Sequence, residues 1–317
     1  MRTIVTGGAG FIGSHVVDRL LEDGSEVIIV DSFDSFYPRS VKLQNLRSAL
    51  IDPRCRLEEW DIRDKEAVIS LVASLQPDAI VHLAARAGVR PSIENPALYT
   101  DVNVMGTVHW LEAATSLETR PRFVYASSSS VYGDRVDAPF RETDPVDRPV
   151  SPYAATKRAC ELLAYTFHHL HGLPVTGLRF FTAYGPRNRP DLAIAKFTRL
   201  IDRGEAVPMF GDGTTKRDYT FVADIVDGVV RAITKCHDHH IYNLGNSNPI
   251  ELRVLIESIG RGLGKIPIID YLPEQPGDVR QTYADIDRAA SELGYNPSTS
   301  FDEGLERYIS WYRANRG

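Results

Sequence analysis

A tyrosine and a lysine four residues apart, Tyr153 and Lys157, have the spacing and chemistry of a proton-transfer pair. Ser151 suits the N-cap and Pro152 the first turn of a helix that would place both side chains on one face. An ammonium group favours the phenolate form of a nearby tyrosine, so Tyr153 is a candidate general base and acid. Tyr-Lys pairs also occur on ordinary helix surfaces, and this alternative stays open from the spacing alone.

A serine-rich run strengthens the catalytic interpretation. Ser127 to Ser130 precede Val131-Tyr132-Gly133 and follow an expected strand at 123–126. A loop at the carboxyl edge of a parallel sheet lies where ligands bind in such folds. We expect its hydroxyls to hydrogen-bond the same substrate oxygen that Tyr153 addresses, although a simple polar turn is the alternative.

A glycine-rich run at Thr6 to Gly13 predicts a phosphate-binding turn between a strand and a helix. Gly7 permits the tight turn, Gly10 lets a pyrophosphate approach the backbone, and Gly13 lets the helix pack closely on the sheet. A purely structural glycine turn is the alternative.

An acidic residue at the end of the next strand favours a dinucleotide, and NAD over NADP. Asp31 follows the glycines at the distance, about 20 residues, where a carboxylate binds a ribose 2′-hydroxyl and repels a 2′-phosphate. Further cofactor contacts are expected from the glycine-rich helix and from the loops after the strands: Phe11, Ile12, Ser32, Asp61, Ile62, Leu83, Ala84 and Ala85.

The elements that position these residues alternate between strand and helix patterns. Strands are expected at 2–5, 27–30, 56–60, 79–83, 123–126 and 175–179. This alternation predicts an α/β fold with a Rossmann-like, doubly wound parallel sheet and a smaller, mixed α/β C-terminal lobe that binds the substrate. We expect residues 1–180, with about 220–245 returning, to form the NAD-binding domain, and about 181–219 with 246–317 to form the lobe.

Composition excludes several classes of function. The 317 residues carry a formal net charge of -6, which gives no basic field for nucleic acid. No apolar run has the length of a membrane span, and nothing precedes the strand at Arg2 as a signal peptide, so we expect a cytoplasmic protein. Cys55, Cys160 and Cys236 are scattered, which favours reduced thiols. The histidines at 237–240 are expected in a polar turn, and no metal site is predicted.

Together with Arg179 to Pro186 and Arg217-Asp218-Tyr219, the runs above resemble the extended short-chain dehydrogenase/reductase superfamily over nearly the whole chain. Within it, the sequence is most similar to the UDP-glucuronate 4-epimerases. This closer likeness rests on His82 to Arg90, on Ser127 to Gly133, and on Thr182 with Arg187-Asn188-Arg189-Pro190-Asp191.

The resemblance implies roles for individual residues. Ser128 is implied beside Tyr153, while Lys157 would hold both Tyr153 and the nicotinamide ribose. The substrate contacts implied are Ser129, Ser130 and Thr182 for the sugar carboxylate, Arg217 and Arg280 with support from Lys196 for the diphosphate, and Arg189 for the sugar, with Arg90 and Arg187 as competitors for that last role. Family members pair through helices corresponding to 98–114 and 152–171, which implies a homodimer.

The implied reaction is an isomerase reaction: epimerisation of UDP-glucuronate to UDP-galacturonate through a 4-keto intermediate. In dehydratases of the superfamily an Asp-Glu pair follows the catalytic hydroxyl, whereas this chain has Ser129 and Ser130. Many relatives acting on neutral hexoses have Asn at the position of Thr182, and hydroxyls suit a carboxylate. The alternatives are a UDP-glucose/UDP-galactose 4-epimerase, a UDP-glucuronate decarboxylase, and a non-catalytic NAD-binding regulator.

Overall fold

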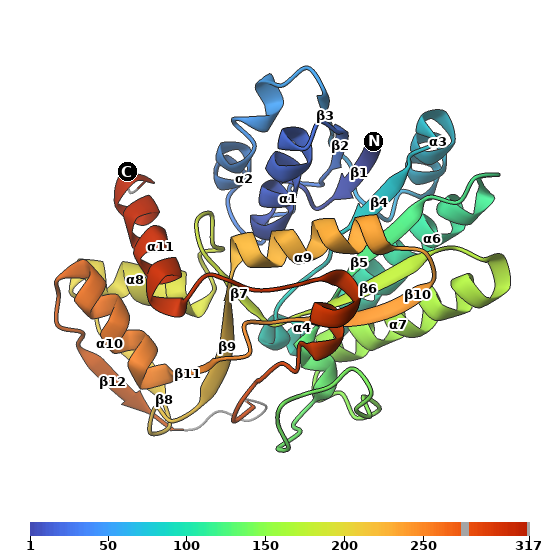
Figure 1. The fold of residues 1–317 in the computed structure, drawn as a ribbon. Helices are drawn as coiled ribbons and strands as arrows, with labels where there is room; N and C mark the ends of the chain where they lie inside the picture. Colours follow the sequence, from blue (N-terminus) through green and yellow to red (C-terminus); the bar gives the residue numbers. More distant parts are fainter. Residues whose placement is uncertain (274–278, 316–317) are drawn as a thin grey trace.

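A seven-stranded parallel sheet forms the centre of the structure, a computed structural model that describes residues 1–273 and 279–315 (Figure 1). The strand order is β10-β6-β5-β4-β1-β2-β3, and every neighbouring pair is parallel. Its strands are β1 (Arg2–Thr6), β2 (Glu26–Val30), β3 (Cys55–Glu58), β4 (Ala79–His82), β5 (Arg122–Ser128), β6 (Val175–Phe180) and β10 (His239–Leu244).

Helices cover both faces of this sheet, which explains why the central strands β1, β2 and β4 carry runs of Val and Ile. Val5 and Ile29 pack with α1 and α9 on one face, while Ile4 and Ile28 pack with α3, α6 and α7 on the other. The helices of this body are α1 (Phe11–Glu22), α2 (Arg39–Asn45), α3 (Lys65–Leu75), α4 (Val89–Glu94), α5 (Pro96–Tyr99), α6 (Gly106–Ser116), α7 (Pro152–His171) and α9 (Val222–Lys235). The predicted Rossmann-like fold is confirmed.

The smaller body lies beside the carboxyl edge of the main sheet (Figure 1). It contains the three-stranded order β11-β9-β7 and the parallel pair β12-β8. Its elements are β7 (Thr182–Tyr184), α8 (Ala193–Arg203), β8 (Val207–Phe210), β9 (Lys216–Phe221), β11 (Pro249–Glu251), α10 (Leu252–Leu263), β12 (Ile269–Leu272) and α11 (Phe301–Asn315). Their apolar faces form a separate core that includes Phe197, Leu255 and Tyr308.

Short helical turns complete the chain: η1 (Ala49–Ile51) and η3 (Ser129–Tyr132) are 3₁₀ turns, and η2 (Thr100–Met105) and η4 (Ala289–Leu293) are π-helical. The segment η2 interrupts the single helix expected over 98–114. The expected third strand also ends early, at Glu58, because Trp60 leaves the sheet and stacks on Trp110 with ring centroids 6.0 Å apart.

The order of the strands creates a switch point between β1 and β4, whose carboxyl ends lie side by side. The chain leaves β1 toward α1 on one side and enters β4 from α3 on the other. Open α/β sheets bind ligands in the crevice at such a point. Along the described part of the chain, no helix is long and apolar enough to cross a membrane.

Candidate functional site

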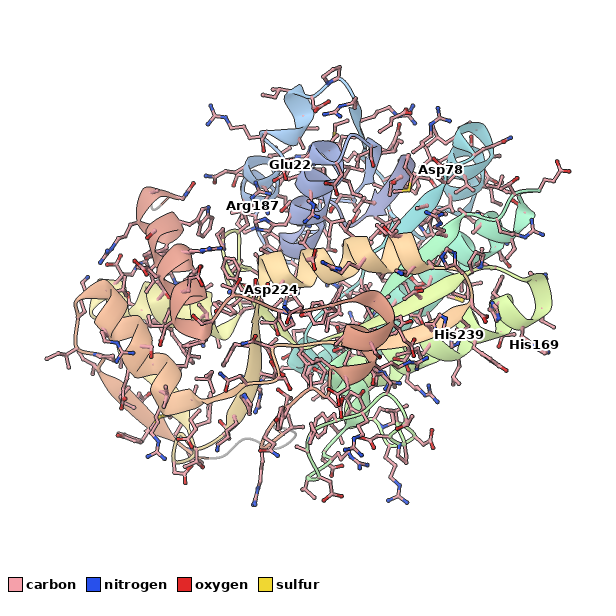
Figure 2. All side chains as sticks on the ribbon, viewed as in Figure 1. Glu22, Asp78, His169, Arg187, Asp224 and His239 are labelled. Atoms are coloured by element: carbon pink, nitrogen blue, oxygen red, sulfur yellow. The ribbon has the colours of Figure 1, made fainter. Side chains whose placement is uncertain are left out.

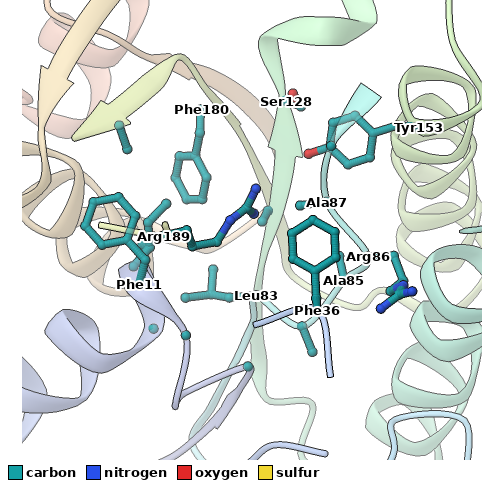
Figure 3. Close-up of a pocket in the computed structure, with 18 of the residues that line it drawn as sticks. Phe11, Phe36, Leu83, Ala85, Arg86, Ala87, Ser128, Tyr153, Phe180 and Arg189 are labelled. Carbon is teal, nitrogen blue, oxygen red and sulfur yellow. The ribbon is translucent and has the colours of Figure 1, made fainter. Parts of the chain in front are cut away.

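A cavity of about 510 Å³ opens at this switch point (Figure 3). It is lined by every residue predicted to bind the cofactor except Lys157. Those lining residues are Gly7, Gly10, Phe11, Ile12, Gly13, Asp31, Ser32, Asp61, Ile62, Leu83, Ala84, Ala85 and Tyr153.

The glycine-rich turn leaves no room for side chains. A Cβ atom on Gly13 would lie 2.1 Å from the carbonyl oxygen of Gly7, and one on Gly7 would lie 2.8 Å from the amide nitrogen of Ala84. No side chain caps the start of α1 at Phe11. Unpaired N–H groups at such a helix end form an anion site, so the turn fits a pyrophosphate.

Asp31 is buried and oriented by three groups. One carboxylate oxygen accepts from the amide of Ala9 at 3.1 Å, and the other accepts from the amide of Phe33 at 2.8 Å. The Lys42 ammonium lies 3.7 Å from this second oxygen and also lines the cavity. The carboxylate is thereby oriented beside the cavity, where ribose hydroxyls would donate to it.

Asp61 lines the same cavity and forms an ion pair with Arg63 at 2.8 Å. The hydrogen bonds from the Arg63 guanidinium lower the pKa of the Asp61 carboxyl. Asp61 is therefore an acceptor at neutral pH, the state that a contact to the adenosine half requires.

Tyr153 and Ser128 both line the cavity, and the phenol oxygen of Tyr153 points to its interior on the side where Ser128 lies (Figure 3). Lys157 is buried behind the wall, and its ammonium donates to the carbonyl oxygen of Ala126 at 2.9 Å. That carbonyl belongs to β5, so the bond ties α7 to the strand that ends in Ser128.

The serine run divides between two directions. Ser127 also lines the cavity, but its hydroxyl donates to the buried Glu161 carboxylate at 2.6 Å. The Ser128 hydroxyl oxygen accepts from the amide of Ser130 at 3.2 Å and lies 3.0 Å from the Ser130 hydroxyl. Ser128, Ser129 and Ser130 thus present three hydroxyls to the cavity in one tight turn.

A second cavity of about 210 Å³ adjoins the first. Ser129, Ser130 and Thr182 line both cavities, so their hydroxyls stand where the two meet. Arg90 and Arg217 line the second cavity, and among its described lining residues no side chain is acidic. Two guanidinium groups in the wall of one cavity suit an anionic ligand.

The remaining cationic candidates differ in their placement. Arg189 lines the first cavity, donates to Asp191 at 2.8 and 3.0 Å, and lies 5.3 Å from the centroid of the Phe36 ring. Arg187, labelled in Figure 2, forms an ion pair with Asp18 of α1 at 2.7 Å and lines neither described cavity.

Two residues predicted to bind the diphosphate lie apart from the described cavities. Lys196 on α8 lines neither of them, and Arg280 is exposed. The run Pro276-Gly277-Asp278, which precedes Arg280 in the sequence, lies outside the described residues. The site geometry therefore brings Arg217 to the substrate side, and the roles of the other two stay predictions.

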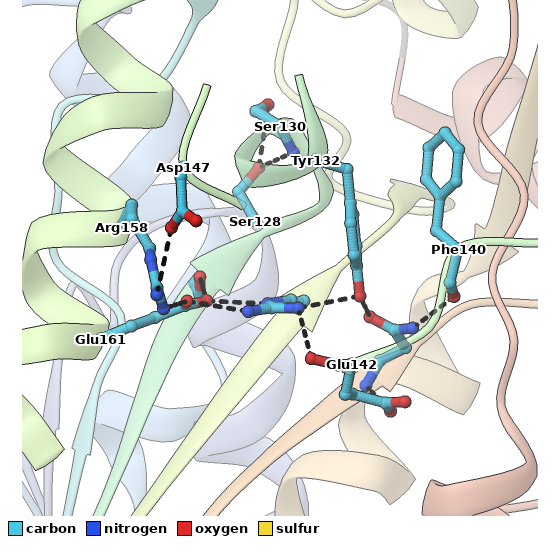
Figure 4. A network of polar contacts seen from close by, with 11 residues as sticks. Ser128, Ser130, Tyr132, Phe140, Glu142, Asp147, Arg158 and Glu161 are labelled. Carbon is cyan, nitrogen blue, oxygen red and sulfur yellow. Dashed lines mark hydrogen bonds and ion pairs between the residues drawn. The ribbon is translucent and has the colours of Figure 1, made fainter. Parts of the chain in front are cut away.

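A buried polar network supports the serine turn from behind (Figure 4). Arg179 and Glu161 form a two-point ion pair at 2.8 and 2.9 Å, with both side chains almost fully buried. Arg179 also donates to the Tyr132 hydroxyl at 3.0 Å, and Tyr132 donates to Asn243 at 2.7 Å. Hydrogen bonds between side chains of this network therefore join α7, β5, η3, β6 and β10.

His82 forms a second buried chain beneath the cavity. Thr107 donates to the carbonyl oxygen of Asn103 at 2.6 Å, so its hydroxyl accepts from His82 Nε2 at 3.1 Å. His82 Nδ1 then accepts from the Thr6 hydroxyl at 2.8 Å. Burial, with a smaller effect from Lys157, lowers the pKa of His82 to about 3, so the ring is neutral.

Sequence patterns missed several residues of the site. Phe36, Tyr37, Lys42 and Arg86 line the first cavity alongside the predicted contacts. Arg86 lies inside the run from His82 to Arg90 that carried the family resemblance, and that run could have marked it as a site residue. The other three follow Asp31 in a loop and a short helix with no pattern that marks a ligand contact.

Comparisons with known proteins agree with this geometry. Residues 4–308 match the family described as GDP-mannose 4,6 dehydratase. A UDP-glucuronate 4-epimerase of Thermodesulfobacterium geofontis is 40% identical, and the alignment covers 98% of this chain and 96% of that protein. The UDP-glucuronic acid 4-epimerase of Bacillus cereus, solved with UDP-glucuronic acid and NAD, is 33% identical with a TM-score of 0.93 over 99% of both chains.

A dTDP-glucose 4,6-dehydratase of Streptomyces venezuelae, solved with NAD bound, is 34% identical, also with a TM-score of 0.93, over 100% of this chain and 98% of that one. The fold is therefore shared by epimerases and dehydratases, and the residues of the site must distinguish them. By its match over residues 4–308 and its relatives at about 40% identity, the chain belongs to this epimerase and dehydratase family of the extended short-chain dehydrogenase/reductase superfamily.

Proposed function

We propose that this protein is an NAD-dependent UDP-glucuronate 4-epimerase, which interconverts UDP-glucuronate and UDP-galacturonate. The observation that carries the proposal is the set of three hydroxyls, Ser129, Ser130 and Thr182, at the junction of the two cavities. They adjoin the Tyr153 and Ser128 pair, so a sugar held by Tyr153 at C4 would direct its C6 carboxylate toward them.

The first cavity fits NAD on its own chemistry. The glycine turn admits a pyrophosphate, Asp31 is oriented to accept from ribose hydroxyls, and Asp61 lies with Ile62 at the adenosine end. A carboxylate beside the 2′-hydroxyl disfavours NADP. When bound there, NAD accepts a hydride from C4 of the sugar and returns it to the opposite face of the same carbon.

The proton moves through Tyr153. The phenolate takes the proton of the C4 hydroxyl, leaving a 4-keto sugar, and the phenol gives the proton back after the sugar has turned over. Ser128 would hydrogen-bond the same oxygen, while Lys157 holds the helix to β5 behind it and supplies positive charge. The cycle is redox-neutral, and no external oxidant is required.

The same hydroxyls disfavour the neighbouring reactions. Dehydration needs an acid and a base after the catalytic hydroxyl, and Ser129 and Ser130 are neither. A 4-keto uronate is a β-keto acid, which loses carbon dioxide when its C5–C6 bond stands perpendicular to the carbonyl plane. Hydrogen bonds from Ser129, Ser130 and Thr182 would restrain the carboxylate and oppose decarboxylation. Because Ser128, Tyr153 and Lys157 provide all the side chains that the proton transfer needs, a non-catalytic regulator is disfavoured.

The nucleotide half of the substrate would occupy the second cavity. Among the described residues that line it, Arg90 and Arg217 are the cations that could bind a diphosphate.

We further propose that residues 1–180 with about 220–245 act as the NAD-binding domain, and that the rest acts as the nucleotide-sugar lobe. A homodimer through residues 98–114 and α7 is part of the same proposal, supported by exposed apolar side chains at Met105 of η2 and at Leu162 and Tyr165 of α7.

Comparing two substrates tests the function. Purified protein is incubated separately with UDP-glucuronate and UDP-glucose, and the products are identified by chromatography and NMR. The proposal predicts UDP-galacturonate as the main product and a much larger kcat/KM for the uronate. Equal or better use of UDP-glucose would favour the hexose 4-epimerase, and a UDP-pentose would favour the decarboxylase.

The Thr182 hydroxyl gives a sharper test of the carboxylate contact. One hydrogen bond to a charged group contributes about 1.5–3 kcal/mol, so Thr182→Val should lower kcat/KM for UDP-glucuronate by about tenfold or more. Activity on UDP-glucose should change little, and Thr182→Ser should retain the preference. An equal loss on both substrates would show that Thr182 only packs.

A further inference from the structure

The first turn of α7, which carries Tyr153, takes one of its hydrogen-bond acceptors from a distant segment. Pro152 has no N–H group, and Ser151 accepts from the amides of Ala154 and Ala155 at 3.1 and 3.0 Å. The amide of Tyr153 donates instead to the hydroxyl oxygen of Ser92, at 3.1 Å and across 61 residues. In this turn, therefore, only the proton-transfer residue depends on another part of the chain.

Ser92 is built to accept this bond. Its side chain is fully buried, and its own hydroxyl donates to the carbonyl oxygen of Val89 at 2.5 Å. The direction of that donation leaves the lone pairs of the oxygen for the Tyr153 amide. Without the hydroxyl, a helix N-terminal N–H group in a partly buried place would lose its acceptor.

Residues of α4 beside Ser92 line the second cavity, and Tyr99 of the next helix, α5, contacts the ring of Tyr153. Arg90 and Ile93 of α4 line that cavity on either side of Ser92. The Tyr99 ring meets the Tyr153 ring edge-on with centroids 6.3 Å apart, and its hydroxyl donates to the carbonyl oxygen of Ala87 at 2.8 Å. Groups on α4 thus touch the substrate side and the backbone of Tyr153 within one helical turn.

We infer that Ser92 is a positioning residue for Tyr153, and that it transmits substrate contacts on α4 to the start of α7. The inference rests on the proton-transfer role proposed for Tyr153. It assigns Ser92 no contact with substrate or cofactor: its hydroxyl sets the position of the Tyr153 backbone, and hence of the phenol oxygen relative to the sugar.

Kinetics of two matched serine substitutions test the positioning role. Ser92→Ala removes the acceptor for Tyr153, while Ser300→Ala removes an equivalent acceptor, 3.3 Å from the amide of Glu303, at the start of α11 far from the site. Both should lower Tm by a similar few degrees. Because small misplacements of reacting groups are costly, Ser92→Ala should lower kcat about tenfold with little change in KM, and Ser300→Ala should leave both unchanged.

The rates are measured with whichever of UDP-glucuronate and UDP-glucose the wild-type protein epimerises, so the inference does not depend on the choice of sugar. A kcat for Ser92→Ala within about twofold of that for Ser300→Ala would overturn it, because a merely structural serine would affect Tm alone.

Hydrogen exchange tests the link to the second cavity without catalysis. In the NAD-loaded protein, UDP should slow amide exchange at 152–157 in the wild type and in Ser300→Ala, but not in Ser92→Ala. Equal slowing in all three proteins would overturn the link. If the wild type turned over neither sugar, the proposed function would fail, and this exchange experiment would still decide the role of Ser92.

Discussion

At the scale of single residues, the chemistry of the site depends on which groups are charged and which are neutral. Asp31 and Asp61 are acceptors held by backbone amides or by an arginine, and Lys157 is a buried cation beside β5. His82 lies close to Lys157 and is neutral, so it adds no second positive charge beneath Tyr153. Lys157, rather than His82, therefore carries the positive charge behind Tyr153 on α7.

The neutral state of His82 predicts how stability depends on pH. Its folded-state pKa of about 3 lies below the value of 6.5 expected in the unfolded chain. Its contribution to stability is therefore complete above pH 6.5 and is lost as the pH falls toward 3, with a slope of up to about 1.4 kcal/mol per pH unit.

Unfolding in urea at several pH values checks this prediction. His82→Gln lacks the titrating ring, so the difference in unfolding free energy between the wild type and this variant should narrow by about 1 kcal/mol from pH 6.5 to 5.5. A difference that stays constant from pH 7.5 to 4.5 would mean that His82 is protonated in the folded protein as readily as in the unfolded chain.

At the scale of elements, the Glu161 and Arg179 pair joins α7 to β6 (Figure 4). Removing one partner leaves the other charge buried, so Arg179→Met should destabilise the protein by about 3–5 kcal/mol, and Glu161→Met by a similar amount. The double variant should be more stable than the sum predicts, because neither member of the buried pair is left charged without the other. Urea unfolding of the four proteins measures this coupling, and strict additivity would contradict it.

Much of the cofactor side could be predicted because its residues sit at fixed offsets from strand ends. The glycines after β1, Asp31 after β2 and Ala84 after β4 reach one cavity once the strands are parallel neighbours. That these strands are parallel, with their carboxyl ends at one edge, follows from the alternating strand and helix patterns. The same reasoning predicted the serine run after β5 at the carboxyl edge, whereas Ser128 beside Tyr153 was implied by the family resemblance.

Contacts between distant segments could not be predicted in this way. Ser92 meets the Tyr153 amide, and Lys42 meets Asp31, through side-chain directions that only the assembled fold determines. The π-helical turn at Thr100–Met105 is similarly tertiary in origin: within it, Asn103 holds the backbone of Arg86 at 2.7 Å and the Thr156 hydroxyl at 3.0 Å. No local spacing marks these partners.

At the scale of the whole molecule, two bodies with separate cores meet along the cavities, and Thr182 begins the strand that leads into the smaller one. Arg90 of α4 lies 5.3 Å from the ring centroid of Phe210 on β8, a contact that bridges the bodies. The sugar would be held between groups from each body. This arrangement fits a substrate that must turn over while its nucleotide stays fixed.

The proposed homodimer makes a prediction at the same scale. Leu162 on α7 is 53% exposed, and a charge there would be buried in the proposed interface. Leu162→Glu should therefore shift the protein from dimer to monomer in light scattering. Ile266→Glu, at a side chain that is 93% exposed on the smaller body, serves as the matched control and should leave the dimer intact. A wild-type monomer would contradict the proposal.

The fate of the hydrogen at C4 tests the central claim most directly. UDP-glucuronate labelled with deuterium at C4 is incubated with the purified protein in ordinary water, and the product is analysed by NMR and mass spectrometry. A redox-neutral inversion through Tyr153 predicts UDP-galacturonate that keeps the deuterium at C4, with no solvent hydrogen introduced at C4 or C5. Loss of the label from C4, or a UDP-pentose product, would contradict the account.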